Sequence, residues 1–105
     1  MRSNFKRPFK NFVKKAHKPL QLAIGDEVDF VCDHPYDGER KSGDLLGFFV
    51  HKFVFSRQTY LIAYRPPQVG ALSDDTEIEF LVIDFYQVGS HENFYDDLKR
   101  YIKEE

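Results

Sequence analysis

The amino-acid sequence predicts an α+β protein in which β-structure dominates: a small, partly open β-barrel with a basic helical arm at its N-terminus and a helix at its C-terminus. Two observations predict this class. Between residues 26 and 88, apolar and aromatic side chains recur with the period of two that is typical of strands. Near both ends of the chain the apolar spacing changes to that of an amphipathic helix. With 105 residues the chain is long enough for one hydrophobic core and too short for two ordinary domains.

The N-terminal arm, residues 1–20, is strongly basic. Its first eighteen residues contain seven Lys or Arg and no acidic residue, and the first carboxylate of the chain is Asp26. Since the remaining body, residues 21–105, contains eight basic and seventeen acidic residues, an arm of charge +7 is joined to a body of charge −9. Such an asymmetry predicts that the arm binds nucleic-acid phosphate, an acidic protein surface or anionic lipid.

The arm is predicted to contain one short amphipathic helix over residues 8–18. Pro8 suits a first helical turn, and Pro19 disfavours helix at the residue before it. One helical face carries Phe9, Phe12, Val13 and Ala16, and the opposite face carries Lys10, Lys14 and Lys18. A helix of about ten residues is marginal on its own, so its apolar face needs a cover. Either the phenylalanines pack against the sheet or they stack on a bound base, and the first alternative still leaves the lysines free to bind phosphate.

The body, a single domain, is predicted to contain four strands and one helix. The strands cover residues 26–32, 45–55, 59–64 and 77–88, and the helix covers residues 90–104. Turn-forming residues mark the loops 33–44 and 68–76 and the hairpin turn 56–58. Two of the strands, 45–55 and 77–88, are apolar on both faces, so both faces need a cover. A bent or barrel-shaped sheet supplies one cover, and the helices supply the other.

The order of these elements resembles that of SH3-like small β-barrels. The resemblance rests on Gly25-Asp26-Glu27-Val28 at the start of the first predicted strand, on the long loop after it and on the hairpin of longer strands that follows. It covers residues 24–88. It implies a binding module and does not indicate a particular ligand.

These observations predict a non-enzymatic binding module that contacts a nucleic-acid backbone. Lysine and arginine neutralise phosphates and release counterions, and phosphate contacts of this kind carry no sequence specificity. The predicted contact residues are Lys6, Arg7, Lys10, Lys14, Lys15 and Lys18 of the arm, with Arg40 and Lys41 of the long loop.

The alternative hypothesis is a protein-interaction adaptor or inhibitor whose acidic, aromatic-rich body docks a basic protein. Its candidate contact residues are Asp33, His34, Tyr36, Asp37, Asp74 and Asp75. The sequence leaves the oligomeric state open, a homodimer included.

Catalytic, metal and cofactor sites are not predicted. The only cysteine, Cys32, lies among aspartates, which disfavour a reactive thiolate, and it cannot form an internal disulfide, which favours a reducing cytoplasm. A metal site at Asp33, His34 and Asp37 would need His51 from the next strand as a further ligand.

No apolar stretch is long enough to span a membrane. The strand aromatics are assigned to the core because few Lys or Arg accompany them; they are Phe49, Phe53, Phe55, Tyr60 and Tyr64.

Overall fold

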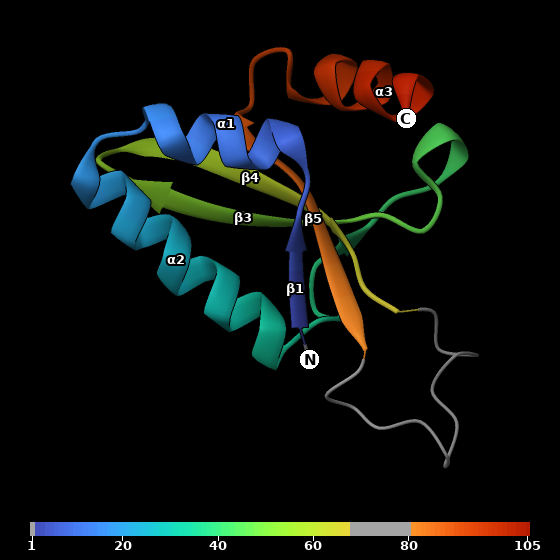
Figure 1. Cartoon of the computed structure of the whole chain (residues 1–105), viewed down its shortest axis with the longest axis horizontal. Coiled ribbons are helices and arrows are strands. Elements are labelled where there is room, and N and C mark those ends of the chain that lie inside the picture. Colours follow the sequence, from blue (N-terminus) through green and yellow to red (C-terminus); the bar gives the residue numbers. More distant parts are fainter. Residues whose placement is uncertain (1, 68–80) are drawn as a thin grey trace.

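The computed structural model describes residues 2–67 and 81–105, which form one five-stranded sheet and three α-helices (Figure 1). The strands are β1 (Arg2–Phe5), β2 (Glu39–Arg40), β3 (Phe49–Phe55), β4 (Gln58–Arg65) and β5 (Val82–Ser90). The helices are α1 (Arg7–Lys15), α2 (Lys18–Asp33) and α3 (Phe94–Glu104), and a 3-10 turn covers Gly43–Leu45. The predicted loop 68–76 and the first four residues of the strand predicted over 77–88 lie outside the described residues.

The sheet is mixed and open. Its strand order is β1-β5-β4-β3-β2. The first strand runs parallel to β5, with Arg2 opposite Val82 and Phe5 opposite Phe85, and the other neighbours are antiparallel. The predicted α+β class is therefore confirmed, but the sheet does not close into a barrel, because β1 and β2 lie at opposite edges.

The strand predicted over residues 26–32 is wrong: this stretch belongs to helix α2. Its buried side chains are Leu20, Ile24, Val28 and Val31, a spacing of three or four residues that places them on one helical face. Phe30, which a strand would bury beside Val28, is 46% exposed. Gly25-Asp26-Glu27-Val28 is thus helical, and the resemblance to SH3-like barrels is not confirmed.

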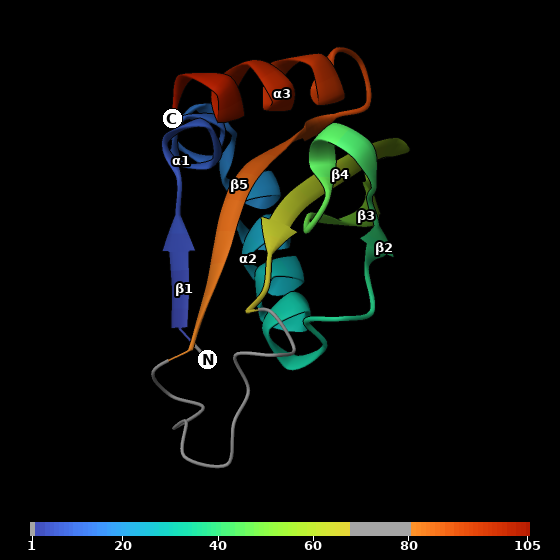
Figure 2. The same cartoon turned by 90° about the vertical axis from the view of Figure 1, so that its right-hand side faces the viewer.

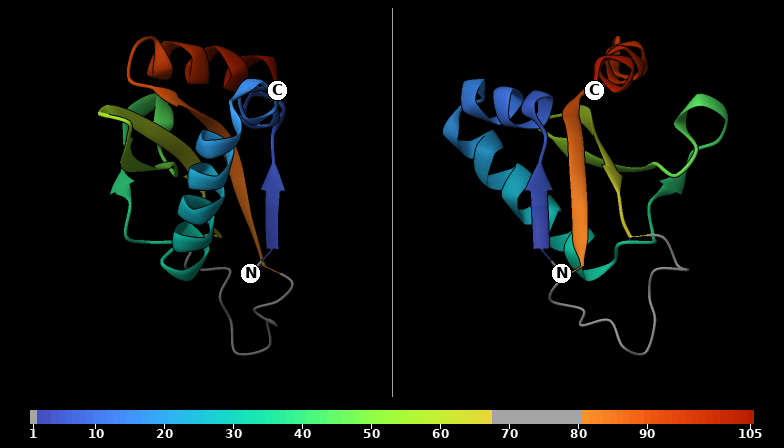
Figure 3. Two further views of the ribbon diagram at one scale, coloured as in Figure 1. Left: turned by 90° about the vertical axis from the view of Figure 1, so that its left-hand side faces the viewer. Right: turned by 45° about the vertical axis from the view of Figure 1, so that its right-hand side comes forward.

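Helices cover both faces of the sheet (Figure 2 and Figure 3). On one face, α1 and α2 contribute Phe9, Ile24 and Val31 to a core with Ile62 and Phe85. On the opposite face, a second core joins side chains of α3 to alternate residues of the central strands; its members are Leu45, Phe48, Val50, Leu61, Ala63, Tyr86, Phe94 and Leu98. The strands that are apolar on both faces are therefore covered on both faces, but by helices on each face and not by a barrel on one of them. Phe49, Phe53 and Tyr64 are buried, which confirms their assignment to the core.

The N-terminal segment is part of this core. Phe9 is only 3% exposed, and its ring centroid lies 5.1 Å from that of Phe5 and 5.8 Å from that of Phe85. The phenylalanines thus pack against the sheet, while Lys10, Lys14, Lys15 and Lys18 are exposed. The predicted C-terminal helix is confirmed, but it begins at Phe94, because β5 continues to Ser90 and Asn93 follows with a φ of 58°.

A basic aromatic pocket as candidate functional site

The structure separates the predicted basic residues into two groups. Arg40 ends β2 and Lys41 follows it, whereas the basic residues of the arm lie on or beside α1, which packs against β5 near the edge formed by β1. Arg40 pairs with Phe49 at the start of β3, whereas the segment after α1 lies near the other end of that strand, where His17 contacts the ring of Phe55. Each group therefore has to be considered as a separate surface.

Two basic residues of the arm are engaged with the C-terminal helix. Lys6 Nζ lies 3.5 Å from Glu105 Oε2 and 5.3 Å from the centroid of the Tyr86 ring. The guanidinium carbon of Arg7 lies 5.5 Å from the centroid of the Tyr101 ring. Both residues thus help to hold α3 against the sheet, through an ion pair and cation–π contacts. They are less available to a ligand than the four exposed lysines.

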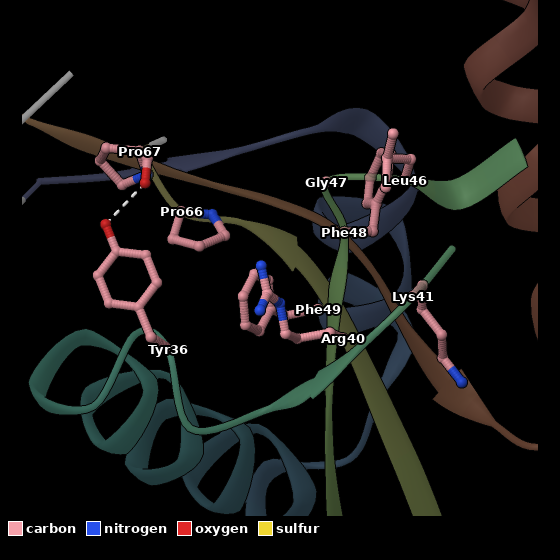
Figure 4. A pocket seen from close by; sticks show the side chains of 9 residues that line it. All are labelled: Tyr36, Arg40, Lys41, Leu46, Gly47, Phe48, Phe49, Pro66 and Pro67. Carbon is pink, nitrogen blue, oxygen red and sulfur yellow. Dashed lines mark hydrogen bonds between the residues drawn. The ribbon is translucent and has the colours of Figure 1, made fainter. Parts of the chain in front are cut away.

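The second group lies at a pocket of about 410 Å³ beside β2 (Figure 4). We call it the basic aromatic pocket. It is lined by Tyr36, Arg40, Lys41, Leu46, Gly47, Phe48, Phe49, Pro66 and Pro67. The lining comes from three parts of the chain: the segment after α2 that includes β2, the residues that lead into β3, and the two prolines that follow β4. Its volume lies in the range of about 300–1,000 Å³ that is typical of sites for small molecules.

Arg40 supplies the free positive charge of this pocket. Its guanidinium carbon lies 5.8 Å from the centroid of the Phe49 ring, and the residue is exposed. Within residues 2–67 and 81–105, Arg40 forms no ion pair with a carboxylate. A planar guanidinium of this kind can bind a phosphate or carboxylate through two parallel hydrogen bonds.

Lys41 is already neutralised. Its Nζ lies 2.8 Å from Glu39 Oε1 and 4.8 Å from the centroid of the Tyr95 ring, and Figure 4 shows its side chain pointing away from Arg40. The hydrogen bond from Lys41 lowers the pKa of Glu39 and raises that of Lys41. Of the two predicted basic residues of the loop, the structure therefore favours Arg40 as the ligand contact.

Aromatic packing and one hydrogen bond set the shape of the pocket. Tyr36 Oη donates to the carbonyl oxygen of Pro67 at 2.6 Å, and burial raises the pKa of Tyr36. The rings of Tyr36 and Phe49 meet edge to face, with centroids 6.1 Å apart. Beside them, the guanidinium carbon of Arg65 lies 5.2 Å from the centroid of the Phe48 ring. These contacts together hold the walls of the pocket.

Comparison with known proteins shows the family. A family model described as a ParE-like toxin of a type II bacterial toxin-antitoxin system matches residues 4–99. The chain belongs to this family. The match runs from β1 into α3, so it includes the basic aromatic pocket. No curated protein and no solved structure matches the chain.

Membership of the ParE-like toxin family makes this chain a small binding or inhibitory module with a protein partner, the antitoxin. Of the residues predicted to bind a protein, Asp33, His34 and Asp37 lie at the end of α2 and just after it, and all three are exposed. His34 Nδ1 lies 3.6 Å from Asp37 Oδ2. Asp74 and Asp75 lie outside the described residues.

The other polar residues considered for chemistry in this toxin have local partners. His51 Nε2 lies 2.7 Å from Glu27 Oε1, and the half-buried Cys32 Sγ lies 3.2 Å from Ser3 Oγ. In the part of the chain that the structure describes, no three His, Cys, Asp or Glu side chains converge as a metal site would require. None of the helices there is long and apolar enough to cross a membrane.

Sequence reasoning named Arg40, Lys41 and Tyr36 but missed the rest of the lining. Phe49 was assigned to the core, and Phe48, Pro66 and Pro67 were not among the candidate site residues. The pocket depends on tertiary contacts, because the Tyr36–Pro67 hydrogen bond joins residues 31 positions apart. The adjacent aromatic residues at positions 48 and 49, which point to opposite faces of a strand, are the one local signal that could have indicated it.

Proposed function

We propose that this toxin binds unpaired nucleic acid at the basic aromatic pocket, without catalysing a reaction. The observation that carries the proposal is Arg40, an exposed guanidinium that rests on Phe49 and has no acidic partner in the described part of the chain. Arg40 would contact a phosphate, and Tyr36 would stack on the adjacent base. A combination of cationic and aromatic side chains is typical of sites that bind single strands.

The exposed lysines of the arm would contribute in a different way. Lys15 and Lys18 flank His17, whose ring contacts Phe55 at the end of β3, whereas Arg40 pairs with Phe49 at the start of that strand. They would attract the phosphates of a longer strand without reading its bases. Because the acidic body repels phosphates, we expect the lysines to contact only a few phosphates, and we expect these contacts to weaken as salt is added.

Fluorescence anisotropy with labelled RNA and DNA of about ten nucleotides tests this function. We expect the wild-type toxin to bind single strands more tightly than duplexes, and to lose affinity as salt rises from about 50 to about 200 mM. The Arg40→Ala variant should bind about 10- to 100-fold more weakly. Arg40→Lys should recover only part of this loss, because an ammonium lacks the planar fork.

Arg100→Ala is the matched control. Arg100 is an exposed arginine on α3 whose only described ion pair, with Asp97, spans 3.4 Å. The Arg100→Ala substitution changes the net charge by the same amount as Arg40→Ala. Equal losses of affinity in both variants would therefore mean that net charge, and not the position of Arg40, decides binding. Binding that is absent, or that does not change with salt, would overturn the proposal.

The family implies an antitoxin as partner, and we propose as a second candidate contact the acidic end of α2. The exposed Asp33 and Asp37 would pair with basic residues of the antitoxin. A pull-down of the coexpressed antitoxin, carried out after nuclease treatment, tests this surface. Loss of capture in Asp33→Lys/Asp37→Lys supports it, and unchanged capture rejects it.

A further inference from the structure

A second concave surface lies between helices α1 and α2, and we call it the helix groove. Its volume is about 680 Å³. The side chains that line its floor include Phe5, Phe9, Val13, Ile24 and Val28. The floor is apolar, because it is made by aromatic and aliphatic side chains of β1, α1 and α2. Such a floor is stabilised when another apolar surface covers it.

The two rims of the groove carry opposite charges. Lys10 and Lys14, four residues apart, form the α1 rim, and Asp26 and Asp29, three residues apart, form the α2 rim. All four residues are exposed. None of them forms an ion pair within the described ranges, so the rims do not neutralise each other across the groove.

The α2 rim is also shaped for close contact with another surface. Leu22 is 60% exposed, which is unusual for a leucine beside an apolar floor. Gly25 lies one helical turn further along, and a Cβ atom placed there would meet no atom within 4 Å. The helix backbone is therefore open at this point, so a neighbouring chain can approach it closely.

We propose that the helix groove is the interface of a two-fold symmetric dimer of this chain. In such an interface the same surface is used by both copies, and residue i of one copy meets residue j of the other. Lys10 and Lys14 then face Asp26 and Asp29 of the partner subunit, and the reverse pairs form at the other end. The two exposed Leu22 side chains become buried against the two apolar floors.

The charge pattern favours a second copy over other occupants. Nucleic acid would be attracted by the α1 rim but repelled by the carboxylates of the α2 rim. An unrelated protein would have to carry an acidic and a basic row at matching positions. A second copy of this chain carries both rows at the required spacing, since they are its own.

Two charge-reversed variants test the dimer without touching the core. Lys10→Glu/Lys14→Glu makes both rims acidic, and Asp26→Lys/Asp29→Lys makes both rims basic. We expect sedimentation equilibrium to show a wild-type dimer, and each variant alone to associate at least about tenfold more weakly. An equimolar mixture of the two variants should form a heterodimer, because every facing pair is then attractive. Circular dichroism of each variant verifies that it is folded.

The mixing experiment needs its own control, because any two oppositely charged proteins attract each other. Asp44→Lys and Lys99→Glu reverse exposed charges away from the groove. These variants should dimerise as the wild type does, with no preference for each other when mixed. Wild-type chains that remain monomeric at about 100 µM would overturn the proposal, since weak specific dimers are populated at such concentrations. It would also be overturned if both groove variants dimerised normally, or if their mixture formed no heterodimer.

Discussion

The substitution Phe9→Ala tests directly whether the basic N-terminal segment is part of the folded core. Phe9 is 3% exposed and packs against Phe5 and Phe85, so its removal leaves a cavity between α1 and the sheet. Large-to-small substitutions of buried phenylalanine cost about 3–5 kcal/mol. A small domain has a free energy of unfolding of only about 5–15 kcal/mol, so the loss is a large fraction of the total.

Urea unfolding followed by far-ultraviolet circular dichroism measures this loss, since the chain contains no tryptophan to report by fluorescence. A decrease of about 4 kcal/mol, with an m-value of about 2 kcal/mol/M, lowers the unfolding midpoint by about 2 M. A variant that is unfolded before urea is added agrees with the upper end of the range.

Phe30→Ala is the matched control for this measurement. Phe30 is also a phenylalanine on a helix, but it is 46% exposed and contacts only the rings of His34 and His51 among the described aromatic pairs. Its removal should cost less than half as much as that of Phe9, because less apolar surface returns to water. Equal losses from the two variants would refute the packing of α1 described here. So would a chain beginning at Gln21 that folds with native stability.

Two further predictions concern the neighbourhood of Tyr64. Gly38→Ala should lower the free energy of unfolding by about 1–3 kcal/mol, because its Cβ would lie 2.5 Å from Tyr64 Oη and 3.1 Å from the carbonyl oxygen of Val50. Gly25→Ala is its control in thermal or urea unfolding at low protein concentration, where the chain is monomeric. It should gain about 0.5–1 kcal/mol, since its Cβ meets no atom of the same chain; equal effects would contradict the geometry. Burial raises the pKa of Tyr64 to about 12, so the phenol stabilises the fold below pH about 10, its unfolded pKa, and this stability is lost as the pH rises to about 12. In a spectrophotometric titration of the six tyrosines, we expect a last ionisation step that the Tyr64→Phe variant lacks. Six tyrosines that ionise together near pH 10 would exclude the shift.

The centre of the sheet could be predicted because its signals are local. The alternating apolar residues of β3 and β4 and the turn between them lie within one short segment. Ser56 and Arg57 take φ values of 51° and 67°, as a two-residue hairpin turn requires. The two-sided apolar pattern of β3 and β5 also predicted correctly that both faces are covered, but helices cover the face that was assigned to a bent or barrel-shaped sheet. These features need no information from distant parts of the chain.

Helix α2 and strand β1 were missed for two different reasons. In α2, Val28, Phe30 and Cys32 alternate over too few residues to distinguish a strand from a helix, and Gly25 suggested a boundary. Pro19 was interpreted as the end of the arm helix, whereas it lies in the first turn of α2. The four residues of β1 carry little pattern of their own, and they pair with a strand about eighty positions away. Such a pairing is decided by tertiary structure.

The same difference between local and distant information applies to the candidate sites. Composition indicated that the arm was basic, but it did not show that Lys6 and Arg7 contact α3 or that Lys10 and Lys14 border a groove. Arg40 was named from its loop, whereas the aromatic surface under it comes from β3. The acidic residues proposed for the antitoxin contact stay a prediction. In each case the residue type was visible in the sequence, and its neighbours were not.

The position of the two proposed surfaces allows their roles to be separated. The helix groove lies between α1 and α2, and the basic aromatic pocket lies beside β2, at the sheet edge opposite β1. A groove variant should therefore leave the binding of a short strand at Arg40 unchanged.

On a longer strand, the two groove variants distinguish between a phosphate contact and a dimer contact at the groove. If Lys10 and Lys14 contact phosphates, reversing them weakens binding, while Asp26→Lys/Asp29→Lys strengthens it. If instead dimerisation joins two pockets on one strand, both variants weaken binding, because each removes the second site. The sign of the effect of Asp26→Lys/Asp29→Lys therefore decides between a phosphate contact and a dimer contact at the groove.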